Sequence, residues 1–511
     1  MTGLSRTDLS TSRKVELAAS ALGQQGQHGA VSLLARAFGV ARGTVYSAKG
    51  TASDVLTAHF GMAAGTAPAD EAATSWPPVR VDGAQIRRAI AALRVVVPGT
   101  LRPIEELLPI LYPGLQLSYG TVQGIAADAE SRAAAFNAGA DLSGITAAAL
   151  DELFSQRRPV LSVVDLLSGY VGCLQLRESR GTEDWADVLR KGRGQGMNLN
   201  IAVKDAAPGI AAGLELVYPE CDQRDDCFHA EYEVGKVGQL LERRAYGAIA
   251  REEETAAALV AAQANGGPVR SLSTKLWWAK GKCEEAIKLY DEFNRGAKLL
   301  EKSMEFVDVE TGAIRTAEEA ERMLREAAQI MMALPKEPKA GKVGRYLRNR
   351  AEGLVKAVKD LEDQLRDLNR GFGEEAVSLA CRIVHLLRGI GEPRRHWQRL
   401  QNERLFMAAL HLLQQREPKR ADGLIRAVDT LVQLRFRASS VVEAFNAALR
   451  PHLYVHRGVT QGFLELLRAY INLRARRSGA FKGMSAHERM TGEPVADWLT
   501  LIGLPPSTHW N

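Results

Sequence analysis

Cysteine is scarce in this chain, with five residues scattered over 511 positions (Cys173, Cys221, Cys227, Cys283 and Cys381). An odd, dispersed set of this kind excludes a disulfide-built scaffold and is typical of a reducing compartment. The chain also lacks an apolar run long enough to cross a bilayer, so we expect no membrane contact. Its first residues lack the apolar core of a signal peptide, which predicts a cytoplasmic protein.

Charged residues make up 25% of the chain and apolar residues 46%, which is the composition of a globular, core-forming protein. The net charge of +6 is unevenly spread. The segment 336–359 holds eight basic residues against two acidic ones, and the segment 468–482 holds five and no acid. Such clusters suit a polyanion, whose phosphates release counterions on binding. A solvated helix face is the alternative for each cluster.

The first 65 residues are Ala-rich and have the pattern of a helix-turn-helix. A helix is expected over 30–38, followed by a turn at Gly39 and a second helix that starts near Ala41. Gly supplies the turn, while apolar residues hold the two helices at a steep angle. Arg42 and Thr44 would then face the major groove of double-stranded DNA.

A second block, residues 78–140, repeats this pattern. A helix is expected over 104–111, a break at 112–114, and a further helix capped by Ser118. Its groove-facing set would be Ser118, Tyr119, Thr121 and Gln123. Helical hairpins with a Gly turn are common in ordinary packing, but two in series before a strand-rich region favour DNA binding.

The only convincing strands lie within residues 143–235, at 145–154, 159–166, 170–177 and 199–204, with a helix expected over 182–190. They are short, apolar and bounded by turn residues, as buried strands are. Asp151 and Asp205 end the first and last of these strands, and Asp165 begins the turn between the second and third. This arrangement resembles the α/β RNase H-like fold of DDE transposases and retroviral integrases, a mixed five-stranded sheet with flanking helices.

The resemblance implies two Mg²⁺ (or Mn²⁺) ions held by Asp151, Asp205 and an acid on a later helix. Glu443 fits that third position, with Asn446 and Arg450 on the same helix face. Ser440-Val-Val-Glu443 is also a capping-box pattern, and Glu242 is a rival third acid. Asp165 fits the non-catalytic aspartate of the family and is the runner-up for the first ligand. After Glu443, the segment 483–492 resembles the closing motif of bacterial insertion-sequence transposases, with Ala486 in place of Pro.

The separation of 238 positions from Asp205 to Glu443 predicts an all-helical insertion over 236–435, by resemblance to hAT-like transposases, and a second part of the catalytic core over 436–511. Asp226 and His229 match the Cys/Asp-x-x-His signature of those families. A zinc site from Cys221, Cys227 and His229 is the alternative, although it lacks a fourth ligand.

Basic and aromatic residues of the insertion supply further expected DNA contacts. Trp277 and Trp278 would stack on a base, or else belong to the core. Lys342, Arg345 and Arg348 would hold phosphates.

Together these features predict a homodimeric or larger, nucleoid-associated DDE transposase that binds its element's ends, nicks them and joins the 3′-hydroxyl to target DNA. A regulator without catalysis and a stand-alone RNase H-like nuclease are the alternatives.

Overall fold

The computed structural model describes residues 9–23, 30–61, 82–205, 207–308, 313–335, 337–391, 396–435, 440–456, 458–478 and 481–506. The expected domain limits at 65, 78 and 436, and Lys336 of the first basic cluster, lie outside these ranges. The chain divides into two compact units, Met1–Val81 and Asp82–Asn511, and each is described by itself.

The first unit holds three helices, α1 (Thr11–Gly23), α2 (Ala30–Phe38) and α3 (Arg42–Gly61). The turn between α2 and α3 passes through Gly39, whose φ of +65° favours glycine. Val40 and Val45 are buried with Leu17 and Leu34 in a small core. This confirms the expected helices and turn.

The second unit begins with α4 (Gly83–Val96), α5 (Leu101–Leu111) and α6 (Tyr119–Ala138). Ser118 caps α6 as expected, because its Oγ accepts a hydrogen bond from the Thr121 amide at 3.2 Å. Ile90, Leu108 and Val122 form the core of this three-helix block. The C-terminal half of α6 also packs against α17 (Gln461–Leu473), so these helices are continuous with the sheet region.

The sheet of the described chain has five strands: β1 (Ala147–Ser155), β2 (Arg158–Asp165), β3 (Val171–Leu176), β4 (Ile201–Lys204) and β5 (Asp222–Asp225). Their order is β3-β2-β1-β4-β5. Strands β1, β2 and β3 pair antiparallel, whereas β4 and β5 run parallel to β1. A mixed five-stranded sheet with flanking helices is therefore confirmed, although the sequence pattern did not reveal β5.

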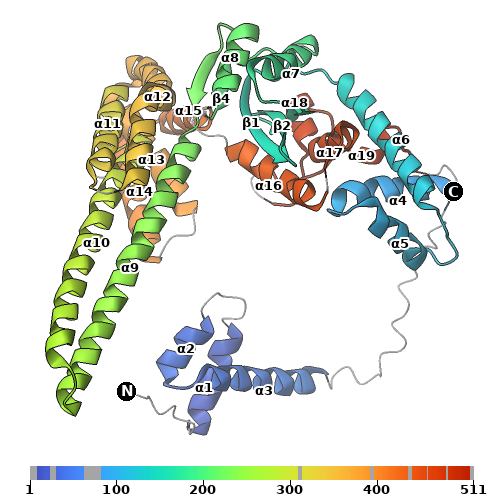
Figure 1. Ribbon diagram of the computed structural model, residues 1–511. Coiled ribbons are helices and arrows are strands. Elements are labelled where there is room, and N and C mark those ends of the chain that lie inside the picture. Colours follow the sequence, from blue (N-terminus) through green and yellow to red (C-terminus); the bar gives the residue numbers. More distant parts are fainter. Residues whose placement is uncertain are drawn as a thin grey trace. The chain divides into compact units, whose positions relative to one another are not determined.

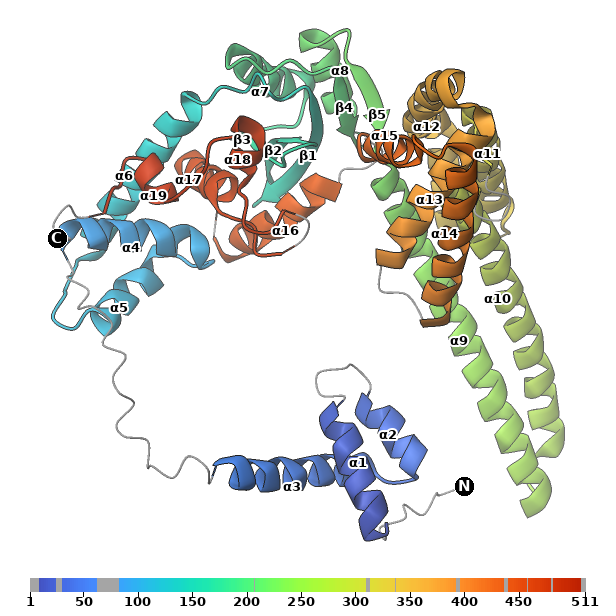
Figure 2. The same ribbon diagram turned by 180° about the vertical axis from the view of Figure 1, so that it is seen from behind.

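Helices cover both faces of the sheet (Figures 1 and 2). Ala149 and Val203 face a core that includes α16 (Ser440–Val455) and α17. Leu150 and Ala202 face the opposite core with α7 (Thr182–Gly194) and α8 (Pro208–Val217). The short helices α18 (Ala486–Thr491) and α19 (Trp498–Leu501) end the described chain. Residues that alternate along β1 and β4 thus face different helices.

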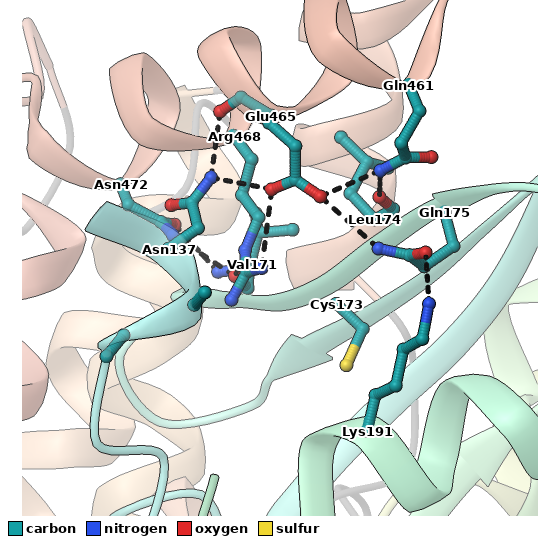
Figure 3. A network of polar contacts seen from close by, with 12 residues as sticks. Asn137, Val171, Cys173, Leu174, Gln175, Lys191, Gln461, Glu465, Arg468 and Asn472 are labelled. Atoms are coloured by element: carbon teal, nitrogen blue, oxygen red, sulfur yellow. Dashed lines mark hydrogen bonds and ion pairs between the residues drawn. The ribbon is translucent and has the colours of Figure 1, made fainter. Parts of the chain in front are cut away.

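The edge strand β3 is bonded by side chains of α17 (Figure 3). The Val171 amide donates to Asn472 Oδ1 at 2.7 Å, and Arg468 Nε donates to the Val171 carbonyl at 2.9 Å. Gln461 Nε2 donates to the Leu174 carbonyl at 3.0 Å. These polar side chains recur on one side of α17 and satisfy the backbone groups that an edge strand leaves unpaired.

The insertion is helical: α9 (Cys227–Asn265), α10 (Val269–Ser303), α11 (Ala317–Ala333), α12 (Pro338–Phe372), α13 (Glu374–Gly391), α14 (His396–Arg416) and α15 (Ala421–Gln433). Helices α9 and α10 lie side by side as a long hairpin (Figures 1 and 2). One core joins α9 to α12 and a second joins α12 to α15. Apart from an isolated bridge between Val307 and Ile314, the described insertion has no strand pairing, as predicted.

Candidate active site

The register of the parallel strands brings two predicted acids together. Leu150 of β1 pairs with Lys204 of β4, so Asp151 and Asp205 are the next pair along the two strands. Asp151 lies two residues after Ala149, and therefore on the α16 side of the sheet. Both aspartates thus stand at the same end of the sheet, facing the helix that carries Glu443.

Helix α16 holds the third predicted acid against this end of the sheet. Fully buried Asn446, one turn after Glu443, donates a hydrogen bond from Nδ2 to Asp151 Oδ2 at 2.5 Å. Arg450 Nη2 lies 3.3 Å from Glu443 Oε2. Glu443, Asn446 and Arg450 therefore lie on one face of α16, as expected, and Asn446 on that face contacts Asp151.

The three acids share one electrostatic environment. The pKa of Asp151 is raised to about 6, chiefly by burial; the negative charges of Asp205 and Glu443 add to the rise, whereas hydrogen bonds from Asn446 and the Glu152 amide oppose it. A buried carboxylate beside two others favours a bound cation, because a cation would offset the cost of ionising it.

The rival acids lie in other surroundings. Glu242 of α9 interacts with Tyr290 of α10 inside the helical hairpin. Asp165 is buried in the turn after β2, where its Oδ2 accepts hydrogen bonds from the Ser168 amide at 2.6 Å and the Ser168 hydroxyl at 2.5 Å. Burial raises the pKa of Asp165. Asp165 and Glu242, the alternatives for the first and third metal ligands, therefore lie elsewhere, whereas Asp151 and Glu443 lie near each other.

The donor types are those that a hard cation prefers, since β1, the end of β4 and α16 each supply one carboxylate at this end of the sheet. In this conformation, however, no three His, Cys, Asp or Glu side chains in the described chain form a ready ligand group. Asp205 Oδ1 accepts a hydrogen bond from the Ala207 amide at 2.8 Å, and Glu443 is paired with Arg450. Binding a metal would exchange these partners for the ion.

The alternative zinc set is likewise not assembled. Cys227 Sγ donates to the Leu354 carbonyl at 3.5 Å, and burial raises the pKa of Cys221 to about 12. Among the described residues, Cys221, Cys227 and His229 do not form a ready ligand group.

The Asp226 and His229 signature lies beside the carboxylates. Because Lys204 pairs with Asp225, Asp226 is the next register neighbour of Asp205. Asp226 is buried and caps α9 by accepting from the Phe228 amide at 2.9 Å. The His229 ring lies 6.1 Å from the ring of Tyr346 on α12.

Tyr346 was not expected at this site. Burial raises its pKa, and the charges of Asp225, Asp226 and Asp205 raise it as well. The insertion thus contributes a phenol to the surroundings of the acids. The sequence offered no signal for it, since a Tyr in an amphipathic helix most often belongs to a core.

Ion pairs fix α12 to β5. Arg350 Nη1 lies 3.1 Å from Asp225 Oδ1, and Lys356 Nζ lies 2.9 Å from Asp222 Oδ1. Lys356, a half-buried basic residue of the segment 336–359, is therefore paired with an acid of β5. Lys342, Arg345 and Arg348 are exposed, as a phosphate-binding surface requires.

The predicted groove-facing residues differ in accessibility. Arg42, Thr121 and Gln123 are exposed, and Thr44 is half-buried. The hydroxyl of exposed Ser118 lies 2.9 Å from Thr121 Oγ1, in addition to its bond to the Thr121 amide. The ring of half-buried Tyr119 packs under the Arg102 guanidinium at 4.2 Å. Ser118 and Tyr119 thus have structural partners already.

Trp277 and Trp278 lie on α10 with 67% and 59% of their surface exposed, and their rings contact each other at 4.8 Å in a T-shaped arrangement. The alternative that they are core residues is wrong.

No helix of the described chain is long and apolar enough to span a membrane. The models of known protein families give no match to this sequence, and a search of curated proteins gives none either.

Proposed function

We propose that this chain is a DDE transposase with an RNase H-like catalytic core and a helical insertion. One observation supports this most strongly. Asp151 and Asp205 are neighbours in the register of β1 and β4, on the side of the sheet that α16 covers, and Asn446, one turn from Glu443 on α16, is hydrogen-bonded to Asp151. The sheet order β3-β2-β1-β4-β5, with its first three strands antiparallel, supports this fold.

Asp151, Asp205 and Glu443 would hold two Mg²⁺ (or Mn²⁺) ions, which supply an activated attacking oxygen and a stabilised leaving oxygen. The protein's own part is to position the ligands. Asn446 orients the Asp151 carboxylate and favours its ionised form, because its amide donates to Oδ2. Arg450, two turns further along α16, orients the Glu443 carboxylate and offers a cation to a scissile phosphate.

DNA recognition would fall to the two helix-turn-helix blocks, through Arg42, Thr44, Thr121 and Gln123. The exposure of Arg42, Thr121 and Gln123, and the position of all four residues at or near the start of α3 and α6, support base contacts. Because two element ends are cut together, we propose a homodimer or larger assembly.

Cleavage of DNA that carries the inverted repeats flanking the coding sequence tests this proposal. Asp151→Asn, Asp205→Asn and Glu443→Gln should each abolish Mg²⁺-dependent nicking while gel-shift binding of the ends persists. Glu242→Gln is the matched control and should cut as the wild type does. If the wild type binds the ends and never cuts them, the chain is instead a DNA-binding regulator; nicking of structured DNA without end preference indicates a nuclease.

A further inference from the structure

A hollow of about 450 Å³ lies on the side of α16 that faces away from Glu443. Val441, Ala444 and Ala448 line it at the three- and four-residue spacing of one helix side, a different side from that of Glu443. Its volume is within the range of small-ligand pockets, roughly 300–1,000 Å³. The hollow is therefore separated from the carboxylates by the thickness of the helix.

Three arginines line the hollow, Arg474, Arg476 and Arg477, and no acidic residue does so among the described residues. All three are exposed, and none has an ion-pair partner in the described chain. The Arg474 guanidinium lies 5.2 Å from the Tyr470 ring. Arginine groups that lack carboxylate partners favour an anion, and phosphate fits their planar fork.

The fold fixes the backbone of Arg476 beside the β2–β3 turn. Arg476 forms backbone hydrogen bonds with Met484 and Gly483, at 3.0 and 2.9 Å. Its Nη2 lies 2.7 Å from where a Cβ on Gly169 would stand, and Gly169 has a φ of +74°. The positive φ favours glycine in the β2–β3 turn, and the turn backbone passes close to the Arg476 guanidinium. This turn is held in addition by Arg489, whose Nη1 donates to the Ser168 carbonyl at 2.7 Å.

We infer that this hollow is a second DNA-backbone site, which takes one nucleotide of a DNA strand. The phosphate would lie between Arg474, Arg476 and Arg477, with sugar and base against the apolar side of α16. The inference rests on the proposed function for its choice of DNA over a free nucleotide. Because the hollow and Glu443 share α16, a strand held there is fixed close to the scissile position.

The test uses the full chain with Asp151→Asn as parent, so that no cutting interferes, and a short 5′-phosphorylated, fluorescently labelled single-stranded oligonucleotide. Changing Arg474, Arg476 and Arg477 together to Gln should weaken binding by roughly tenfold or more at low salt and lower the salt slope by about 0.7 per lost contact. The matched control changes Arg295, Arg325 and Arg366 to Gln, which removes the same charge from exposed ion pairs. Equal weakening in both variants would overturn the inference.

A second variant separates the hollow from general surface charge. Ala444→Phe fills it without changing the charge, and exposed Ala444 can carry a larger side chain without disturbing the core. It should weaken oligonucleotide binding, whereas unchanged binding contradicts the inference. Displacement of the oligonucleotide by deoxyadenosine monophosphate at comparable concentration would assign the site to a free nucleotide instead. If the oligonucleotide requires the arginines and the wild type cuts no DNA with Mg²⁺, the site stands and the transposase proposal fails.

Discussion

Asn446 and Asp151, 295 residues apart in the chain, are joined by a 2.5 Å hydrogen bond between α16 and β1. The Asn446 amide donates this bond to the ionised carboxylate and thereby lowers the pKa of Asp151, which burial raises by a larger amount. The protonation state of Asp151 therefore depends on Asn446, which lies on the same helix as Glu443.

The first prediction concerns the pH dependence of cleavage. A pKa of about 6 predicts that cleavage falls as the pH falls through this value, because protonated Asp151 cannot bind a metal ion. Asn446→Ala removes a hydrogen bond that lowers the pKa, so its acid limb should move to higher pH. The control, exposed Asn349→Ala, should keep the wild-type profile. An unshifted limb in Asn446→Ala would contradict the positioning role.

The second prediction concerns stability. Because folding raises the pKa of Asp151 from 3.8 to about 6, its contribution to stability is present below pH 3.8 and is lost as the pH rises through 6. Asp151→Asn should therefore stabilise the metal-free protein at pH 7, by at most roughly 3 kcal/mol. The gain should shrink toward pH 4. Thermal melts in a chelating buffer at both pH values measure it, and a pH-independent difference would argue against the assigned cause.

The third prediction concerns sequence recognition. Arg42→Ala or Gln123→Ala should reduce discrimination between element ends and random DNA by ~1–3 kcal/mol if the side chain reads a base edge. The control is Arg36→Ala, at an exposed position on α2, which should leave this discrimination unchanged. Competition gel shifts decide the matter, since equal weakening toward all DNA would mark a phosphate contact.

The fourth prediction concerns the exposed basic side of α12. Changing Lys342, Arg345 and Arg348 to Ala should lower the salt slope of DNA binding by about 0.9 per lost contact, with the greatest loss of affinity at low salt. Lys356→Ala is the contrasting variant. It should lower the melting temperature instead, because Lys356 pairs with Asp222. A triple variant with the wild-type slope would leave this face without a DNA role.

The fifth prediction concerns the tandem tryptophans. Trp277→Ala and Trp278→Ala should leave the melting temperature unchanged, because both side chains are mostly exposed. Each should weaken binding to single-stranded flanking DNA by ~1–3 kcal/mol if it stacks on a base. Fully buried Trp185→Ala is the counterpart that should destabilise the fold. Unaltered affinity in both α10 variants would remove the stacking role.

The apolar strands and capped helices could be predicted because their signals are local. Ser118 caps α6, and β1 to β4 lie within two residues of their expected bounds. Strand β5 could not be predicted, because Asp-Gln-Arg-Asp has neither apolar alternation nor β-forming residues. It forms because β4 pairs with it and α12 offers Lys356 and Arg350 to its acids. Tyr346 was missed for the same reason, since only tertiary packing brings it to Asp226.

The two outer strands of the sheet are both occupied by side chains from helices. On β3, Gln461 and Asn472 take the backbone groups, and on β5, Lys356 Nζ donates to the Gln223 carbonyl at 3.0 Å. A strand from another copy finds no open partner at these positions, so recruitment by strand addition is disfavoured. In the assembly on DNA that we propose, copies would then associate and separate through helical surfaces, with no rearrangement of the sheet at each exchange.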